Sequence, residues 1–248
     1  MFGMNKIENL RESEVIGGHE YKFVVQGTLL FLTGAPLSGK STIAPLITSL
    51  IEDCTLQPMD IMRLVAQEIE SHKPESERNP FVNYGSCDSY VVVGDGTYSP
   101  EKLVIGFNAY SEAVSSSLKS IIPKLEVQSA QNVLFEGVQL TPSLVTPYLK
   151  NNNRLVVITS DASQIESNRS KMFGDSAELI ARYSTDKLLL LQDEIIRQSR
   201  EIPEYKLMCV NNVGNYTSAV AQIIGYLFNT DVIDKKIARM GKKTPHDR

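Results

Sequence analysis

The chain has 248 residues, of which 42% are hydrophobic, and this is enough apolar material for the core of one α/β domain. It has no run of about 18 apolar residues and no apolar signal segment at its start, so we expect a cytoplasmic protein with no membrane partner. The three cysteines and three histidines lie far apart and without paired spacing, which argues against a zinc site or a disulfide framework.

The formal charge of −4 is unevenly distributed along the sequence. Residues 231–248 carry a net charge of +3, which leaves −7 on residues 1–230. We therefore separate a basic C-terminal tail, residues 229–248, from the rest of the chain. Such a tail could bind nucleic acid or another polyanion, and the alternative is a solvated terminus.

The first predicted elements lead into a phosphate-binding loop. Residues 1–27 form an N-terminal leader with a short strand at 21–25, and the apolar residues 28–32 form the next strand. The pattern Gly-x4-Gly-Lys-Ser follows directly, and a helix is predicted at 41–52, which is the context of a nucleoside triphosphate site. The predicted nucleotide-binding residues are Gly34, Ala35, Pro36, Leu37, Ser38, Gly39, Lys40, Ser41 and Thr42.

The chemistry of a triphosphate explains the spacing of this loop. Its glycines let backbone N–H groups point at the phosphates, and the following helix adds its positive N-terminal end. Lys40 is predicted to reach the β- and γ-phosphates, and Ser41 to ligate a magnesium ion. ATP and Mg²⁺ are therefore the expected ligands, and a plain glycine-rich turn is the alternative.

Two charged residues open the next predicted helix. A second strand is expected at 54–59, and apolar residues at helical spacing follow at 60–70. Asp60 could accept the proton of an acceptor hydroxyl, and Arg63 could hold a phosphate on the acceptor side. The alternative is that Asp60 only caps its helix and that Arg63 is its exposed partner.

The region from about 72 to 110 is predicted to be an insert over the active site. It is polar and glycine-containing up to residue 100, where one long helix is expected to begin and to run to 125. Aromatic rings gather here, and rings such as Tyr84 and Tyr90 suit a stacked base better than a small, doubly negative acid. The alternative is an apolar segment that packs on the core. The aromatic residues are Phe81, Tyr84, Tyr90, Tyr98, Phe107 and Tyr110.

An acidic residue ends the next predicted strand. The apolar residues 132–135 are followed by Glu136 and Gly137. Because ligands of parallel α/β sheets bind at the carboxyl ends of the strands, Glu136 is expected near the phosphate loop. There it could order a magnesium-bound water or orient the acceptor hydroxyl, whereas a surface turn is the alternative.

The second half of the chain repeats the alternation of strands and helices. Strands are predicted at 155–159 and 206–210, a helix capped by Asp161 follows the first of them, and further helices are predicted at 182–201 and 217–228. This rhythm predicts an α/β P-loop fold over residues 28–228, with a parallel sheet covered by helices on both faces.

Cations flank a glycine-containing link within residues 165–185. Arg169 precedes Gly174 and Arg182 follows it. This pattern is typical of a mobile lid whose cations close on the triphosphate. The alternative is that each arginine lies on a solvated helix face.

Taken together, several segments resemble the kinase domain of the 2-phosphoglycerate kinase family. This resemblance implies a nucleoside- and nucleotide-kinase-like P-loop fold and ATP-dependent transfer to a hydroxyl, with an Asp-x-x-Arg element at the acceptor and an arginine-bearing lid. The sequence departs from the family at Gln139, where the family has histidine, and at Asp88-Ser89-Tyr90, where it has Ser-Ser-Tyr. The matching segments are residues 34–42, 60–63 and 135–142, Arg169, Arg182-Tyr183 and the strand end at Asn211.

A short P-loop kinase with a base-like acceptor is also similar to the enzymes of phage DNA hypermodification. These enzymes phosphorylate the hydroxymethyl group of 5-hydroxymethyluracil in DNA, and the aromatic segment favours such an acceptor. The modified base would have to leave the base stack to reach the γ-phosphate. Two alternatives remain open, which are a small-molecule kinase of the 2-phosphoglycerate type and a non-catalytic switch that depends on a nucleoside triphosphate.

Overall fold

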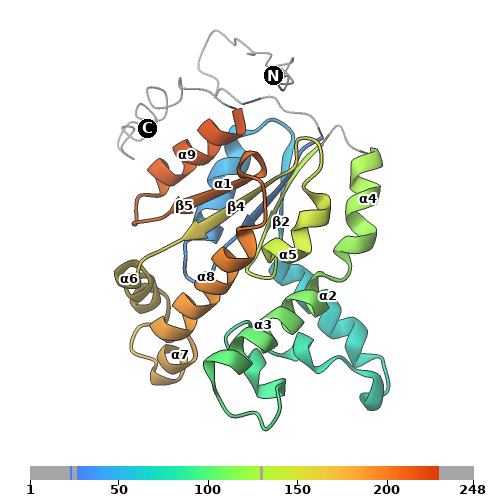
Figure 1. The fold of residues 1–248 in the computed structure, drawn as a ribbon, viewed down its shortest axis with the longest axis vertical. Helices are drawn as coiled ribbons and strands as arrows, with labels where there is room; N and C mark the ends of the chain where they lie inside the picture. Colours follow the sequence, from blue (N-terminus) through green and yellow to red (C-terminus); the bar gives the residue numbers. More distant parts are fainter. Residues whose placement is uncertain (1–22, 24–26, 129–130, 229–248) are drawn as a thin grey trace, which may run out of the picture.

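The computed structural model describes residue 23 and residues 27–128 and 131–228, which Figure 1 draws in colour. Most of the leader and the whole basic tail lie outside the described residues. Of the strand predicted at 21–25, only Phe23 is described, and it forms an isolated parallel bridge with Ile51.

A five-stranded parallel sheet lies at the centre of the described chain. Leu32 of the central strand pairs with Glu136 on one side and Val156 on the other. The order β2-β3-β1-β4-β5, with the phosphate loop after β1, is that of a nucleoside- and nucleotide-kinase-like P-loop fold, so the predicted fold class is confirmed. The strands are β1 (Leu29–Thr33), β2 (Cys54–Pro58), β3 (Asn132–Glu136), β4 (Arg154–Thr159) and β5 (Leu207–Asn211).

Helices cover both faces of the sheet. On one face, α1 (Lys40–Leu50) and α9 (Tyr216–Phe228) pack in a buried cluster that includes Leu30 and Leu32. On the other face, Leu29 and Phe31 pack in a second cluster with residues of α3 (Pro100–Ser115) and α8 (Thr185–Ser199). β1 is buried along its whole length, and its side chains alternate between the two clusters because successive strand residues point to opposite faces.

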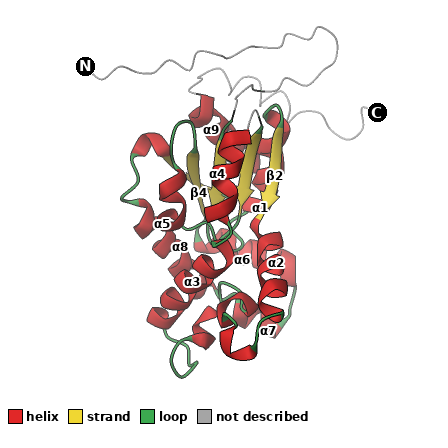
Figure 2. Cartoon of the chain, turned by 90° about the vertical axis from the view of Figure 1, so that its right-hand side faces the viewer, coloured by secondary structure: helices red, strands yellow, loops and turns green. Residues whose placement is uncertain are grey.

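The remaining elements frame the carboxyl ends of the strands. In both Figure 1 and Figure 2, α2 (Met59–Ser71), α3 and α7 (Ala177–Arg182) lie beyond the end of the sheet towards which the strands point. This is the end at which the phosphate loop leaves β1. The other elements are α4 (Leu118–Gln128), α5 (Pro142–Val145), α6 (Ala162–Phe173) and the 3-10 turns η1 (Glu75–Glu77), η2 (Pro80–Asn83), η3 (Ser89–Val92), η4 (Thr146–Tyr148) and η5 (Glu204–Lys206).

Two helix predictions are wrong in their extent. The single helix expected at 100–125 is divided into α3 and α4 after Ser115. Serine side chains there bond to backbone carbonyls, as Ser116 Oγ does to Ala113 O at 3.0 Å, and so compete with the helical bonds. The helix expected at 182–201 starts later, because Arg182 ends α7 and Ser184 takes the N-cap position of α8.

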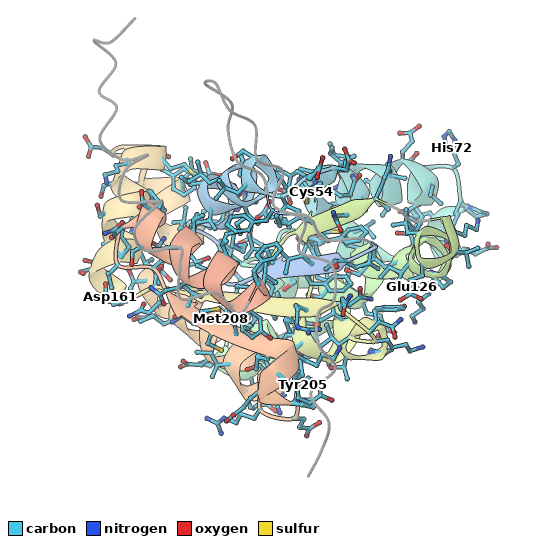
Figure 3. All side chains as sticks on the ribbon, turned by 90° about the horizontal axis from the view of Figure 1, so that it is seen from above. Cys54, His72, Glu126, Asp161, Tyr205 and Met208 are labelled. Carbon is cyan, nitrogen blue, oxygen red and sulfur yellow. The ribbon has the colours of Figure 1, made fainter. Side chains whose placement is uncertain are left out.

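The edges of the sheet are marked in Figure 3 by Cys54 of β2 and Met208 of β5. Burial raises the pKa of the Cys54 thiol to about 11, so this thiol is unreactive near neutral pH. Within the described residues, no helix has the length and apolar character needed to cross a membrane.

Candidate active site

Two glycines allow the phosphate loop to pass close to its neighbours. The loop joins β1 to α1, and Gly39 is the N-cap of α1. The φ angle is 151° at Gly34 and 92° at Gly39, a range that side-chain-bearing residues rarely adopt. A Cβ on Gly34 would lie 2.2 Å from the carbonyl oxygen of Ile158, and a Cβ on Gly39 would lie 2.4 Å from Asn212 Nδ2. Both positions therefore require glycine.

Side chains from three other segments hold the loop by its backbone carbonyls. Asn212 Nδ2 donates to Ser38 O at 2.8 Å, and Ser160 Oγ donates to the same oxygen at 3.3 Å. From α6, Asn168 Nδ2 donates to Leu37 O at 2.8 Å. Leu37 has a φ of 65°, a left-handed conformation that costs a non-glycine residue about 1 kcal/mol or more. The bond from Asn168 and the packing of Leu37 on the core help to offset this strain.

Lys40 lies within the curve of the loop. Its Nζ donates to Ala35 O at 2.7 Å and lies 3.4 Å from Ser38 Oγ. Burial lowers the pKa of the Lys40 ammonium, while the negative charges of Glu136 and Asp60 oppose this shift. Phosphate groups in the loop would add negative charge and so favour the ammonium form.

Ser41 and Glu136 meet beside Lys40, at the ends of neighbouring elements. Ser41 Oγ donates to Glu136 Oε1 at 3.3 Å. Burial raises the pKa of Glu136, and the charge of Lys40 acts in the opposite direction. Within the described residues, no group of three or more His, Cys, Asp and Glu side chains could hold a metal. Two hard oxygens do fit Mg²⁺, because this ion commonly takes only one or two protein ligands and completes its shell with phosphates and water.

Asp60 lies one residue inside α2 rather than at its cap. β2 runs into the helix through Pro58, which is the N-cap, and α2 has no side-chain cap bond, so the capping alternative for Asp60 is wrong. Asp60 Oδ1 accepts a hydrogen bond from Gln139 Nε2 at 3.2 Å. Its charge acts on the pKa of both Lys40 and Glu136, which places the three groups in one electrostatic site. Arg63 is half-buried one turn further along α2.

The two arginines of the predicted lid are bound by other protein groups. Arg182 forms an ion pair with Asp88, which lies in the region expected to be an insert. Arg169 Nη1 donates to Thr185 Oγ1 at 3.2 Å and to Tyr183 O at 3.4 Å. The structure therefore gathers Lys40, Ser41, Asp60 and Glu136, whereas the two arginines bond to other segments.

The aromatic residues of the insert differ in how far their side chains are buried. Phe107 and Tyr110 are buried in the core, whereas Tyr84 and Tyr90 are half-buried. Lys187 Nζ, from α8, lies 4.9 Å from the centroid of the Tyr90 ring and 5.1 Å from that of Tyr98. The alternative of packing on the core therefore holds for Phe107 and Tyr110, and the partly buried Phe81 and Tyr90 also pack against this core. Lys187 covers part of the Tyr90 ring.

Sequence reasoning overlooked several residues that build this site. Ser160 and Asn212 each follow a strand directly, and that position could have revealed them. Asn168 and Lys187 lie in segments whose local pattern contains no signal for their contacts. Gln139 was noted as a departure from a family, but nothing in its segment indicated its contact with Asp60.

No family model matches the chain, and no curated protein matches it. Among solved structures it is similar to a gluconokinase from Sinorhizobium meliloti 1021, with 12% identity over 86% of this chain and 97% of that chain and a TM-score of 0.47. It is similar to thymidylate kinase from Candida albicans, with 14% identity over 86% and 94% of the two chains and a TM-score of 0.43. It is also similar to shikimate kinase from Acinetobacter baumannii, with 16% identity over 82% of this chain and 94% of that chain and a TM-score of 0.43. At identities below 25% and TM-scores below 0.5, these similarities carry no argument about this chain.

Proposed function

We propose that this chain is an ATP-dependent kinase that transfers the γ-phosphate to an acceptor hydroxyl. The observation that carries this proposal is the pairing of β2 with β3, in which Pro58 lies opposite Glu136, because it brings an acid two residues further along, Asp60, to the Ser41–Glu136 pair. The charge of Asp60 also acts on the pKa of Lys40 and of Glu136. A non-catalytic switch would need the phosphate loop and a magnesium ligand, but it would have no use for an acid on the acceptor side.

Each group has a role in the proposed transfer. Lys40 and the N-terminal end of α1 bind the β- and γ-phosphates, and Ser41 and Glu136 would hold Mg²⁺ beside them. When bound, this ion neutralises charge on the phosphates. Asp60 accepts the proton of the acceptor hydroxyl while the new O–P bond forms, and the bond to the β-phosphate oxygen breaks to release ADP.

The lid arginines take part only if they exchange partners. Arg182 would leave Asp88, and Arg169 would leave Thr185, to reach a bound triphosphate. Closure of the lid over the site would keep water away from the transferring phosphate.

Two classes of acceptor are candidates for this site. The aromatic insert favours a base, with 5-hydroxymethyluracil in DNA as the specific candidate, and half-buried Tyr84 is the ring best suited to stack on it. The second candidate is a small anionic alcohol of the 2-phosphoglycerate type. The cation of Lys187 over Tyr90 and Tyr98 favours it, because this lysine adds positive charge to the region and covers part of one ring. Arg63 would contact either acceptor from α2.

Labelled ATP and magnesium, offered with a panel of acceptors, test the proposal. The panel contains DNA with 5-hydroxymethyluracil, the same DNA with thymine, free nucleosides and phosphoglycerates. We expect label on one hydroxyl-bearing acceptor, and the thymine DNA controls for transfer to sites other than the hydroxymethyl group. Label found only in free phosphate would contradict the kinase proposal and favour the switch.

Asp60→Asn is expected to lower kcat by about 10²-fold or more, because the amide keeps the shape and can still accept a hydrogen bond but cannot take the proton. The KM for ATP should change little. Steady-state kinetics with the acceptor identified by the panel provide the measurement, and Asp53→Asn, in the turn before β2, is the matched control. Unchanged kinetics in Asp60→Asn would remove Asp60 from the chemistry.

A further inference from the structure

Gln139 joins two elements that frame the acceptor side of the site. Its side chain is fully buried, and its Nε2 donates to Asp60 Oδ1 of α2 at 3.2 Å and to the Tyr110 hydroxyl of α3 at 3.1 Å. Its backbone carbonyl accepts a third bond, from Ser115 Oγ at 3.3 Å. The residue is therefore anchored at both ends, and one N–H of its amide is directed at a carboxylate.

The orientation of this amide follows from its partners. A carboxylate only accepts hydrogen bonds, so the NH2 group and not the oxygen must face Asp60. This leaves Gln139 Oε1 buried and without a hydrogen-bond partner among the described residues. A buried acceptor without a partner is unfavourable for stability, so the two bonds that the NH2 group donates have to offset this cost.

Gly137 makes room for this arrangement. A Cβ at position 137 would lie 2.4 Å from Gln139 Oε1 and 2.6 Å from the Cβ of Met59. The turn after β3 thus folds the glutamine back against the first turn of α2, where Asp60 lies. Gly137 gives the Gln139 side chain room, Tyr110 fixes its amide, and the amide in turn orients the carboxylate of Asp60.

We infer that Gln139 is a positioning residue for Asp60. Its amide holds one oxygen of the Asp60 carboxylate in place and leaves the other oxygen directed to the acceptor hydroxyl. This inference rests on the proposed kinase function. A neutral amide suits the task, because it orients the carboxylate without placing a counter-charge beside the base. Tyr110 fixes the amide in turn, since its hydroxyl accepts the second N–H.

Kinetics and stability together distinguish positioning from a merely structural role. We expect Gln139→Leu to lower kcat by about tenfold or more, the usual range for a group that orients a functional side chain, with an unchanged KM for ATP. Its melting temperature should change little, because the substitution removes the unpartnered oxygen but also leaves the buried Tyr110 hydroxyl without the N–H that it accepts. Gln198→Leu on α8 is the matched control, as Gln198 bonds to Glu194, Asn108 and Ser143 instead. A lower melting temperature with a normal kcat would overturn the inference.

A double-mutant cycle tests whether Gln139 acts through Asp60. In the Asp60→Asn background, adding Gln139→Leu should cause no further loss of kcat, because the base that it positions is already absent. Losses that multiply would show that Gln139 acts independently and would overturn the inference.

The side-chain amide signals of Gln139 give a readout that needs no activity. In ¹H–¹⁵N spectra, the two signals can be assigned because they disappear in Gln139→Leu. Both amide protons should exchange slowly with solvent, and their chemical shifts should change in Asp60→Asn and in Tyr110→Phe. If the wild-type protein labels no acceptor, the kinase proposal is wrong. If the amide signals shift in neither variant, the hydrogen bonds from Gln139 to Asp60 and Tyr110 are absent, and the inference is overturned whether or not the protein is active.

Discussion

Lys40→Ala is expected to lower phosphoryl transfer by about 10²- to 10³-fold or more, the effect of removing one group that stabilises charge in a transition state. The Lys40 ammonium lies within the phosphate loop, 2.7 Å from Ala35 O, where it can contact charge that grows on the phosphates. The fold should persist, because the side chain belongs to neither hydrophobic cluster. Turnover with the acceptor found in the panel, beside the melting temperature, provides the measurement.

The matched control is Lys119→Ala, because this exposed lysine on α4 contacts only Glu112 at 3.7 Å among the described ion pairs. It should leave both turnover and melting temperature unchanged. Comparable turnover in purified Lys40→Ala would contradict the assignment of residues 34–42 as a catalytic phosphate loop.

Glu136→Gln is the second change with a large expected effect. The substitution preserves shape but removes the charge beside Ser41, so turnover should fall by about 10²-fold or more while ATP still binds. Isothermal titration with a non-hydrolysable ATP analogue, with and without magnesium, separates binding from chemistry. We expect the wild-type protein to gain more affinity from magnesium than Glu136→Gln does.

A glutamate of similar burial provides the control. Glu194 on α8 is 6% exposed, against 9% for Glu136, and Arg197 and two amide side chains lower its pKa to about 2. Glu194→Gln should therefore lower stability near neutral pH and leave turnover intact. If Glu136→Gln behaved in the same way, Glu136 would be structural and its metal-binding role would be wrong.

The pH dependence follows from the burial of Glu136. Burial raises its pKa above the ordinary value of 4.5, so the carboxylate is lost as pH falls through this raised pKa. The value of kcat/KM should decline on the acidic side at a higher pH than an exposed glutamate would cause, because this ratio reports groups of the free enzyme. The decline should be absent from the residual activity of Glu136→Gln, and its persistence there would assign it to another group.

Local patterns in the sequence were sufficient for much of the fold, and they indicated most of the residues that the candidate site brings together. Apolar runs located the strands, and Gly34, Gly39 and Lys40 located the phosphate loop. The position of Glu136 followed from the rule that parallel strands present their carboxyl ends at one edge. The division of α3 from α4 was missed, because helical periodicity continues through the serines at the break. The sequence placed the N-cap of α2 at Asp60, two residues after its actual position at Pro58.

The sequence by itself determined the α/β class, the glycine-containing loop between β1 and α1 and the acid at the end of β3, because each depends on neighbours in the chain. Only the tertiary structure decided how these parts are held. Asn168 supports Leu37 across 131 positions, and Gln139 reaches Asp60 across 79. Lys187 covers Tyr90 from another helix. Such contacts arise when helices pack at the end of the sheet, and the packing depends on the whole core rather than on any local pattern.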